Sequence, residues 1–508
     1  MTTITRNPSN AAQSSYNLII IGGGIYGAML TLEAARRNLR ALLIEKADFG
    51  GATSYNSLRI VHGGFRYLQT LDLPRFYESV GERKWFLKTF PELVKPLSCL
   101  MPLYGKGLRR PPILLTALKL NDTLSFTRNQ GIRPDRHLPP GKVIKTEAVK
   151  AIFPNVDSEG LQAGAIWYDA CMPDSQRLVI GALRWACSLG ATALNYVEAQ
   201  DLLKVNQTVS GVVAQDQLTG ETHEYQGKIV VNAAGPWCRE LAANFDREVP
   251  NLFYKSIAWN ILFDRASLSD FALAIEPKKP NAQTYFLHPW KGRLLAGTIH
   301  NPWFKTIEAN PIPDPSEISE FIDNLNFAIP GLKLSQSQIL RVFSGLLPAE
   351  EPNSKELAVR EVILNHETLP QGIKGLYSIS GVKFTTARLV AEKTIQQIFP
   401  QLSPVDATEI APAEAQRLQG LYDYHWYPQP ELNDCSEELK DIIKNESVQH
   451  LDDLILRRTS LGDNPQRALK IAPMICKLFN WDDSKSKQEI QRLEEFYQRC
   501  GMAEWAKI

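Results

Sequence analysis

Residues 17–28 of the chain read NLIIIGGGIYGA, and this stretch decides the fold. The apolar run 17–21 predicts a short buried strand, and a helical pattern follows the glycines to about Asn38. A second strand-like run, residues 41–44, ends at Glu45. A strand, a glycine turn, a helix and a second strand in this order are typical of the start of a doubly wound α/β sheet.

The glycines of this turn match a dinucleotide-binding pattern. Gly22, Gly24 and Gly27 spell G-x-G-x-x-G. The first glycine makes the tight turn, the second lets the backbone approach a pyrophosphate, and the third lets the helix pack on the strand. The helix N-terminus offers free N–H groups to the phosphates. Glu45, 18 positions after Gly27, can accept hydrogen bonds from both ribose hydroxyls. We therefore predict that this unit binds the adenosine diphosphate half of a dinucleotide.

Residues 52–67, ATSYNSLRIVHGGFRY, favour FAD over NAD. Hydroxyl groups of Thr53, Ser54 and Ser57 could bond the pyrophosphate and the ribityl chain, and the glycine pair 63–64 would let the backbone lie against an isoalloxazine ring. An NAD-binding domain has little use for such a segment. The alternative is a polar loop without a ligand.

A second glycine segment near the other end of the chain supports the same cofactor. Residues 381–386, GVKFTT, open a helix whose N-terminus could stabilise negative charge on a reduced flavin. The predicted cofactor-binding set is Gly22, Gly24, Gly27, Glu45, Lys46, Thr53, Ser54, Ser57, His62, Gly63, Gly64, Gly235, Trp237, Gly381, Phe384 and Thr385.

The strands of the nucleotide-binding part are spread along the chain. Strand 228–232 runs into AAGPW, and strand 376–380 runs into the GVKFTT segment and a helix to about Phe399. We expect an α/β chain with a discontinuous Rossmann-like FAD-binding domain. Its predicted pieces are residues 17–85, 171–250 and 345–400.

The remaining segments predict a second domain. The runs IAWNILFD, AQTYFLH and RLLAGTI are strand-like, which indicates an antiparallel sheet that faces the substrate. This substrate domain is expected to comprise residues 86–170 and 251–344.

The two ends of the chain are predicted to differ in order. Residues 1–16 are polar and lack the apolar core of a signal peptide, so we expect a disordered lead-in. Residues 401–428 are rich in Pro and Gln and predict a linker. Residues 405–508 are expected to hold a C-terminal helical domain, because VQHLDDLILRRTSL and KQEIQRLEEFYQRC space apolar residues three and four apart.

Composition excludes several classes of function. The chain has 508 residues and a formal net charge of +1, so there is no electrostatic case for a nucleic-acid partner. Seven scattered cysteines without a C-x-x-C pair argue against a metal site and fit reduced thiols in a cytosolic protein. No stretch reaches about 18 uninterrupted apolar residues, so no transmembrane helix is expected. We expect a cytoplasmic protein.

Residues 106–120, KGLRRPPILLTALKL, join basic residues to an apolar run. Two interpretations stay open. The segment could touch anionic lipid on the inner face of a membrane, as a peripheral quinone reducer would need. It could instead be a proline-started helix that packs into the core.

The motifs resemble those of FAD-dependent glycerol-3-phosphate dehydrogenases and oxidases, within the wider group of D-amino-acid-oxidase-like enzymes. The resemblance covers nearly the whole chain from about residue 17, and HLDDLILRRTSLG is similar to the family's helical C-terminal domain. It implies non-covalent FAD, oxidation of the secondary alcohol of glycerol 3-phosphate by hydride transfer to flavin N5, and quinone or oxygen as electron acceptor. It leaves the oligomeric state open. The matching segments are IIIGGGIYGA, ATSYNSLRIVHGGFRYLQ, VVNAAGPW, PWKGRLLAGT and ISGVKFTTARLVAEK.

Three residues carry over to the catalytic site by this resemblance. Arg66 and Tyr67 match the family's G-G-x-R-Y segment beside the substrate, and Lys383 matches the lysine of G-G-K-x-T-T. A forked guanidinium and a compact ammonium both suit a phosphate.

Other family positions are changed. Leu347 replaces the arginine of S-G-x-R-P, Ala258 replaces the histidine of K-G-x-H, and G-T-T-D ends here in His300. Loss of one arginine would weaken phosphate binding roughly 10- to 100-fold. Loss of a general base typically costs about 10²–10⁴ in rate. The sequence therefore predicts an intact flavin site beside a remodelled substrate site, with a substrate that is larger or less anionic than glycerol 3-phosphate.

Several alternatives follow from these changes. His288, His300 and Tyr67 are candidates to replace the missing base, although each histidine could also be structural. The enzyme could instead be an amine or 2-hydroxy-acid oxidase in which Arg66 holds a carboxylate. A third hypothesis is a flavin-binding partner protein without turnover.

Overall fold

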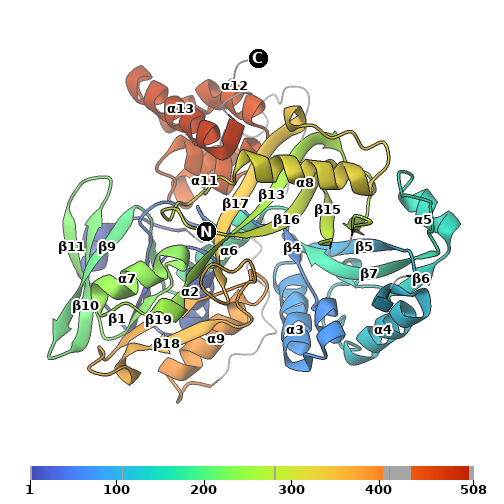
Figure 1. Cartoon of the computed structure of the whole chain (residues 1–508). Coiled ribbons are helices and arrows are strands. Elements are labelled where there is room, and N and C mark those ends of the chain that lie inside the picture. The colour runs from blue at the N-terminus through green and yellow to red at the C-terminus, as the bar shows by residue number, and fades with distance from the viewer. Residues whose placement is uncertain (1–2, 106, 280–281, 404–410, 412–435, 503–508) are drawn as a thin grey trace.

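Figure 1 shows the computed structural model of the chain, which describes residues 3–105, 107–279, 282–403, 411 and 436–502. Most of the linker predicted at 401–428 lies outside these residues. Three sheets and a C-terminal group of helices make up the described part.

A six-stranded sheet forms the nucleotide-binding part. Its strands follow the order β18-β19-β12-β2-β3-β8. All neighbours pair in parallel except β18, which is an antiparallel edge strand. The strands β2, β3, β12 and β19 are buried along their whole length, as expected for parallel strands covered on both faces. The bounds are β2 Leu18–Ile21, β3 Ala41–Ile44, β8 Thr192–Leu194, β12 Val230–Asn232, β18 Val362–Asn365 and β19 Leu376–Ser380.

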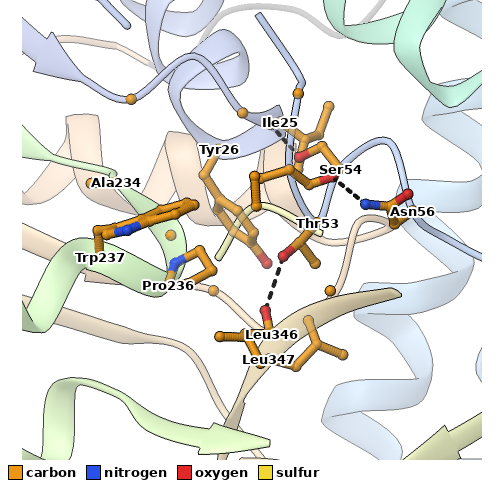
Figure 2. Close-up of a pocket in the computed structure, with 18 of the residues that line it drawn as sticks. Ile25, Tyr26, Thr53, Ser54, Asn56, Ala234, Pro236, Trp237, Leu346 and Leu347 are labelled. Atoms are coloured by element: carbon orange, nitrogen blue, oxygen red, sulfur yellow. Dashed lines mark hydrogen bonds between the residues drawn. The ribbon is translucent and has the colours of Figure 1, made fainter. Parts of the chain in front are cut away.

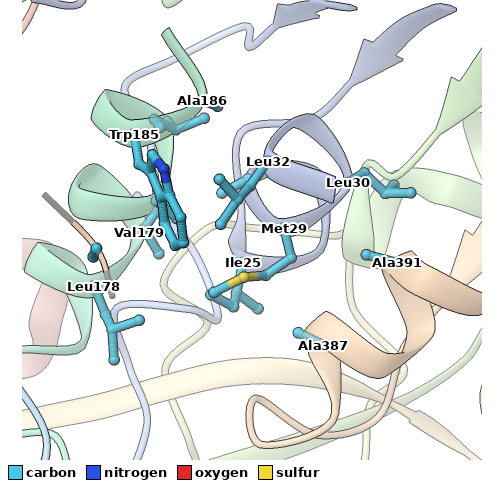
Figure 3. Close-up of a cluster of buried hydrophobic side chains, with 14 of the residues drawn as sticks. Ile25, Met29, Leu30, Leu32, Leu178, Val179, Trp185, Ala186, Ala387 and Ala391 are labelled. Atoms are coloured by element: carbon cyan, nitrogen blue, oxygen red, sulfur yellow. The ribbon is translucent and has the colours of Figure 1, made fainter. Parts of the chain in front are cut away.

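Side chains of β2 alternate between two layers. Leu18 and Ile20 enter a helical layer, whereas Ile19 and Ile21 pack against a small second sheet on the other face. Figure 3 shows the helical layer, where apolar side chains of α2, α6 and α9 meet. These helices are Ile25–Ala35, Ser175–Ser188 and Ala387–Ile398, and the small sheet is β1 Ser15–Tyr16, β11 Thr222–Gly227, β10 Thr208–Asp216 and β9 Val197–Val205.

The third sheet is large and mostly antiparallel. Its path is β17-β13-β16-β15-β14-β5-β7-β4, with β6 paired to β7 and only β14–β5 parallel. Helix α8 (Pro315–Ala328) packs on it through Phe321 and Leu325. The bounds are β4 Ile60–Val61, β5 Lys95–Leu103, β6 Lys142–Ile144, β7 Ala163–Cys171, β13 Tyr254–Ala266, β14 Ala272–Ile275, β15 Tyr285–Trp290, β16 Arg293–Pro302 and β17 Ile339–Ala349.

The remaining helices lie outside these sheets. Helices α3, α4 and α5 gather near β5 and β7, and α11, α12 and α13 form the C-terminal group (Figure 1). The bounds are α3 Leu73–Thr89, α4 Pro111–Leu124, α5 Thr146–Ile152, α7 Cys238–Phe245, α11 Ser436–Asn445, α12 Pro465–Cys476 and α13 Asp483–Tyr497. The predicted fold class, a Rossmann-like α/β part with an antiparallel sheet and C-terminal helices, is confirmed.

Two expectations about segments differ from the structure. Residues 345–349 belong to β17 of the large sheet, not to the nucleotide-binding part, because β13 continues the pairing to Ala349. Within the predicted disordered lead-in, residues 3–16 are ordered and include helix α1 (Pro8–Ala12). Buried Ile4 donates its N–H to the carbonyl of Asn445 at 2.9 Å. Such a partner more than 400 residues away leaves no local signal in a polar segment.

Glu489 of α13 predicts a pH-dependent stability. Burial raises the pKa of Glu489, but hydrogen bonds from His450, Lys485 and the N–H of Leu451 outweigh it and lower the pKa to about 2. The ionised form therefore contributes stability that is complete above about pH 4.5 and is lost as the pH falls toward about 2. Melting temperatures of wild type and Glu489→Gln should differ most near neutral pH and converge across that window.

The exposed Glu437, whose ion pair among the described residues is with Lys440, provides the control. Glu437→Gln should leave the melting temperature nearly unchanged at every pH. A difference for Glu489→Gln that is the same at pH 7 and pH 3 would contradict this linkage.

Candidate functional site

A cavity of about 770 Å³ lies at the carboxyl ends of the parallel strands. Gly22, Glu45, Ala233 and Gly381 follow β2, β3, β12 and β19 and line it. Ligands of open α/β sheets bind at this edge. The volume falls within the range of about 300–1,000 Å³ that cofactor sites occupy.

The glycine turn needs its glycines for measurable reasons. Gly22 has φ +112°, and a Cβ there would lie 2.5 Å from the carbonyl oxygen of Ala233. A Cβ on Gly27 would lie 1.8 Å from the carbonyl oxygen of Gly22. Gly24 caps α2 at the cavity. The glycines therefore let the N-terminus of α2 lie against the cavity, with Ser54 Oγ as the nearest side-chain atom to a Cβ at Gly24.

Glu45 is held as a carboxylate acceptor at the end of β3. Its Oε2 accepts from the N–H of Gly23 at 2.6 Å and its Oε1 from the N–H of Ala47 at 2.9 Å. Burial raises the pKa of Glu45, whereas these two hydrogen bonds and Lys46 oppose the rise. Lys46 lies over the ring of Trp237, 4.3 Å from its centroid.

Hydroxyl groups connect this turn to the large sheet. The N–H of Ile25 donates to Ser54 Oγ at 3.0 Å, and Thr53 Oγ1 donates to the carbonyl of Leu346 on β17 at 3.0 Å. Figure 2 shows these side chains around the cavity, opposite Trp237. The two sheets thus meet at the site through residues 53–54.

Most predicted cofactor-binding residues line the cavity, and three do not. The N–H of Gly63 donates to Asp169, and a Cβ there would lie 1.9 Å from the guanidinium of Arg83. Gly64 has φ +77° and packs against Ser79. Gly27, which packs against the carbonyl of Gly22, is the third residue outside the cavity wall. All three glycines therefore allow close packing and do not line the cavity. The predicted residues that line the cavity are Gly22, Gly24, Glu45, Lys46, Thr53, Ser54, Ser57, His62, Gly235, Trp237, Gly381, Phe384 and Thr385.

The three predicted catalytic residues lie together. Lys383 lines the cavity, and its Nζ donates to the hydroxyl of Tyr67. Burial and the charge of Arg66 lower the pKa of Lys383 to about 8, so its ammonium is still mostly protonated at pH 7. Arg66 is exposed in the turn Phe65–Thr70 and is not part of the cavity wall. The ring of His62 lies edge-on to the ring of Tyr67. Burial and the charge of Lys383 lower the pKa of His62 to about 4.

The register of the large sheet distinguishes the two candidate histidines. Ala258 of β13 lies directly opposite His300 on β16 and Gly345 on β17. Ala258, His300 and Leu347 all line the cavity. His300 Nδ1 is buried without a hydrogen-bond partner among the described residues. Burial and Arg66 lower the pKa of His300 to about 4, so it is neutral at pH 7.

His288 lies elsewhere. It is buried on β15 opposite Leu295 and is not part of the cavity wall. Burial, Lys95 and Arg59 lower the pKa of His288 to about 3. Of the two histidines, His300 is the one that can meet a ligand.

Some cavity residues had no recognisable signal in the sequence. The hydroxyl of Tyr26 donates to the carbonyl of Lys383 at 2.7 Å and accepts from its N–H at 3.0 Å. A Cβ on Gly381 would lie 1.8 Å from the Tyr26 ring. The C-terminal helices also reach the cavity. Asp452 and Arg457 are charged residues within the run LDDLILRR (451–458), which is the signal that the sequence offered for them. The residues they contribute are Asp452, Arg457, Arg492 and Phe496.

Several known proteins are similar to this chain. Glycerol-3-phosphate dehydrogenase of Synechocystis sp. is 29% identical over 463 residues, which cover 88% of this chain and 80% of the relative. Aerobic glycerol-3-phosphate dehydrogenase of Staphylococcus aureus is 26% identical, with 80% and 71% covered. The structure of glycerol-3-phosphate dehydrogenase from Bacillus halodurans complexed with FAD has a TM-score of 0.71 at 21% identity and covers 98% of both chains.

A family model gives the assignment. Residues 17–397 match the model for FAD dependent oxidoreductases (DAO). This match spans well over half of the chain, and the structural relative from Bacillus halodurans has the same fold. The chain therefore belongs to the FAD-dependent oxidoreductase family, which confirms the predicted cofactor, FAD, and the predicted enzyme class.

Proposed function

We propose that this enzyme oxidises glycerol 3-phosphate at the secondary alcohol. The observation that carries the proposal is one continuous cavity that runs from the dinucleotide turn at Gly22 to Lys383, whose pKa is lowered by burial and by the charge of Arg66. Relatives that are named glycerol-3-phosphate dehydrogenases support this substrate over the larger or less anionic one that the changes at positions 258 and 347 suggest. The amine-oxidase and partner-protein alternatives have less support, because the Lys383–Tyr67 pair is retained.

The described residues fit FAD. The N-terminus of α2, bare of side chains at Gly22 and Gly24, suits a pyrophosphate, and Glu45 suits a ribose. Thr53 and Ser54 add hydroxyl groups along the same wall. FAD, when bound, supplies the acceptor for a hydride from the alcohol carbon.

The chain's own residues bind and orient the alcohol. Lys383 attracts the phosphate and holds it beside Tyr67, and the exposed Arg66 adds positive charge from outside the cavity wall. Leu347 reduces this attraction because it presents no charge to the cavity. A phosphate dianion close to His300 would raise the pKa of its imidazole from about 4 toward neutrality, which makes it a better proton acceptor.

We infer that His300 accepts the hydroxyl proton, in place of a group at position 258 on the neighbouring strand. His300→Gln should lower kcat/KM by about 10²–10⁴. Because the free imidazole has a pKa of about 4, wild-type kcat/KM should fall below that pH, and this acid limb should be absent in the variant. Steady-state kinetics from pH 3.5 to about pH 8 checks both.

His288→Gln is the matched control, since His288 is buried in the same sheet but outside the cavity wall. It should keep the acid limb of kcat/KM. A His300→Gln enzyme with a full rate and an unchanged pH profile would assign the proton to another group.

The substrate itself is tested by anaerobic flavin bleaching at about 450 nm. Glycerol 3-phosphate should bleach the wild-type flavin, and Leu347→Arg should tighten its binding roughly 10- to 100-fold by adding a charge-assisted hydrogen bond. Leu347→Met, an apolar change of similar volume, should leave the affinity near that of wild type. No bleaching, in a protein that dithionite still reduces, would exclude glycerol 3-phosphate as the substrate.

We also propose a membrane quinone as the electron acceptor. Helix α4 buries only Leu114 and Leu118, and the segment 107–126 exposes other large apolar side chains, here called the α4 surface. Basic Arg110 and Lys119 are exposed beside them. Such a surface suits anionic lipid. The α4 surface comprises Leu108, Ile113, Leu115, Leu120 and Phe126. Within the described ranges, no helix is long and apolar enough to span a membrane.

Cosedimentation with vesicles of phosphatidylglycerol and phosphatidylcholine tests this surface. The double variant Leu108→Asp/Phe126→Asp should lose most of its vesicle binding, because it removes apolar area and adds negative charge. Val205→Asp is the control. Val205 is an exposed apolar residue (62%) on β9 of the small sheet, outside the α4 surface. Equal binding by the double variant and wild type would contradict lipid contact through the α4 surface.

A further inference from the structure

The loop that follows β3 is held from two sides. Residues 45–54, here called the cofactor loop, carry Glu45, Thr53 and Ser54 on the cavity wall. On its inner side, the N–H of Gly50 donates to the carbonyl of Gly23 at 2.9 Å, which joins the loop to the glycine turn. Asp48, which is itself part of the cavity wall, meets the C-terminal helical region.

Asp48 receives two guanidinium groups from that region. Arg457 Nε and Arg458 Nη1 both donate to its Oδ2 at 2.6 Å, and Arg458 Nη2 donates to its Oδ1 at 2.7 Å. Asp48 and Arg458 are at most 2% exposed. Burial opposes ionisation of Asp48, but the two arginines dominate and hold the pKa of Asp48 well below its usual range.

Further contacts satisfy the remaining polar atoms. Arg457 Nη2 donates to Asp452 at 2.7 Å and to Asp453 at 2.6 Å, and the hydroxyl of Tyr196 donates to Asp453 at 2.6 Å. Asn195 Nδ2 donates to Asp48 at 2.9 Å. Each buried charge has a partner of opposite sign, so removal of one partner leaves an uncompensated buried charge.

The same network borders the cavity. Asp452 and Arg457 are themselves part of the cavity wall, together with Arg492, which donates to Asp452 at 2.8 Å. The C-terminal helices, the cofactor loop and the glycine turn therefore form one connected set of contacts around the end of the cavity where Glu45 lies.

We propose that the C-terminal helices clamp the cofactor loop through Asp48, so that docking of these helices and binding of FAD stabilise each other. Coupling between two binding events is reciprocal, so loosening the clamp must weaken FAD to the same extent that FAD tightens the clamp. These residues lie on the cofactor side of the cavity, so the effect is independent of which alcohol the enzyme oxidises.

Titration of the full-length apoprotein with FAD, followed by flavin fluorescence, tests the clamp. Asp48→Asn keeps the shape but leaves two guanidinium groups without a carboxylate, and it should raise the FAD dissociation constant about tenfold or more. Arg458→Lys keeps the charge but loses the fork, and it should raise the constant in the same direction by a smaller factor. If Asp48→Asn does not fold, the FAD dissociation constant of Arg458→Lys tests the clamp instead.

Arg184→Met is the matched control. Arg184 of α6 donates to Glu446 at 2.7 Å and so also joins the C-terminal region to the rest of the chain, from a helix outside the cofactor loop. This variant should lower the melting temperature and leave FAD affinity within about twofold of wild type.

Limited proteolysis gives a second readout. FAD should slow cleavage within residues 436–502 of wild type more than in the Asp48→Asn or Arg458→Lys protein. Wild-type FAD affinity in both the Asp48→Asn and the Arg458→Lys protein would overturn the clamp. An equal loss of affinity in Arg184→Met would also overturn it, because the effect would then be general destabilisation.

Discussion

The close approach of the turn between β2 and α2 to the end of β12 is the contact on which the rest of the structure depends. A Cβ atom on Gly22 would lie 2.5 Å from the carbonyl oxygen of Ala233. A Cβ atom on Gly27 would lie 1.8 Å from the carbonyl oxygen of Gly22. No side chain fits in either gap, so α2 begins directly above the sheet edge with its N-terminus at the cavity. Every other wall of the cavity is arranged around that opening.

Residues from two sheets line this cavity. The parallel sheet and the loops that follow its strands contribute backbone groups, Glu45 and hydroxyls to the cavity wall, while the antiparallel sheet contributes Ala258, His300 and Leu347. The replacements at Ala258, His300 and Leu347 all fall on the antiparallel sheet. The chain can therefore change its substrate pocket without disturbing the cofactor turn, because the two sets of residues belong to different hydrogen-bonded ladders.

Local patterns predicted the parallel sheet well. The strands β2 and β3 are buried on both faces, so they appear as short continuous apolar runs with bounds close to those observed. Helix α2 ends at Ala35, earlier than predicted, and the chain turns at Asn38 with φ +58°. The order of residues 3–16 could not be predicted, because contacts such as that of Ile4 with Asn445 join distant parts of the chain.

The sequence by itself determined the dinucleotide turn, the acid at Glu45 and the Arg66–Tyr67 and Lys383 motifs, because these signals depend on residue type and short spacing. Tertiary structure alone decided that His300 lines the cavity while His288 does not, because strand register sets which side chains share a face. It also decided that Arg457 and Arg458 reach Asp48, about 410 positions earlier. Those contacts exist only once the C-terminal helices dock, and no local pattern encodes where they dock.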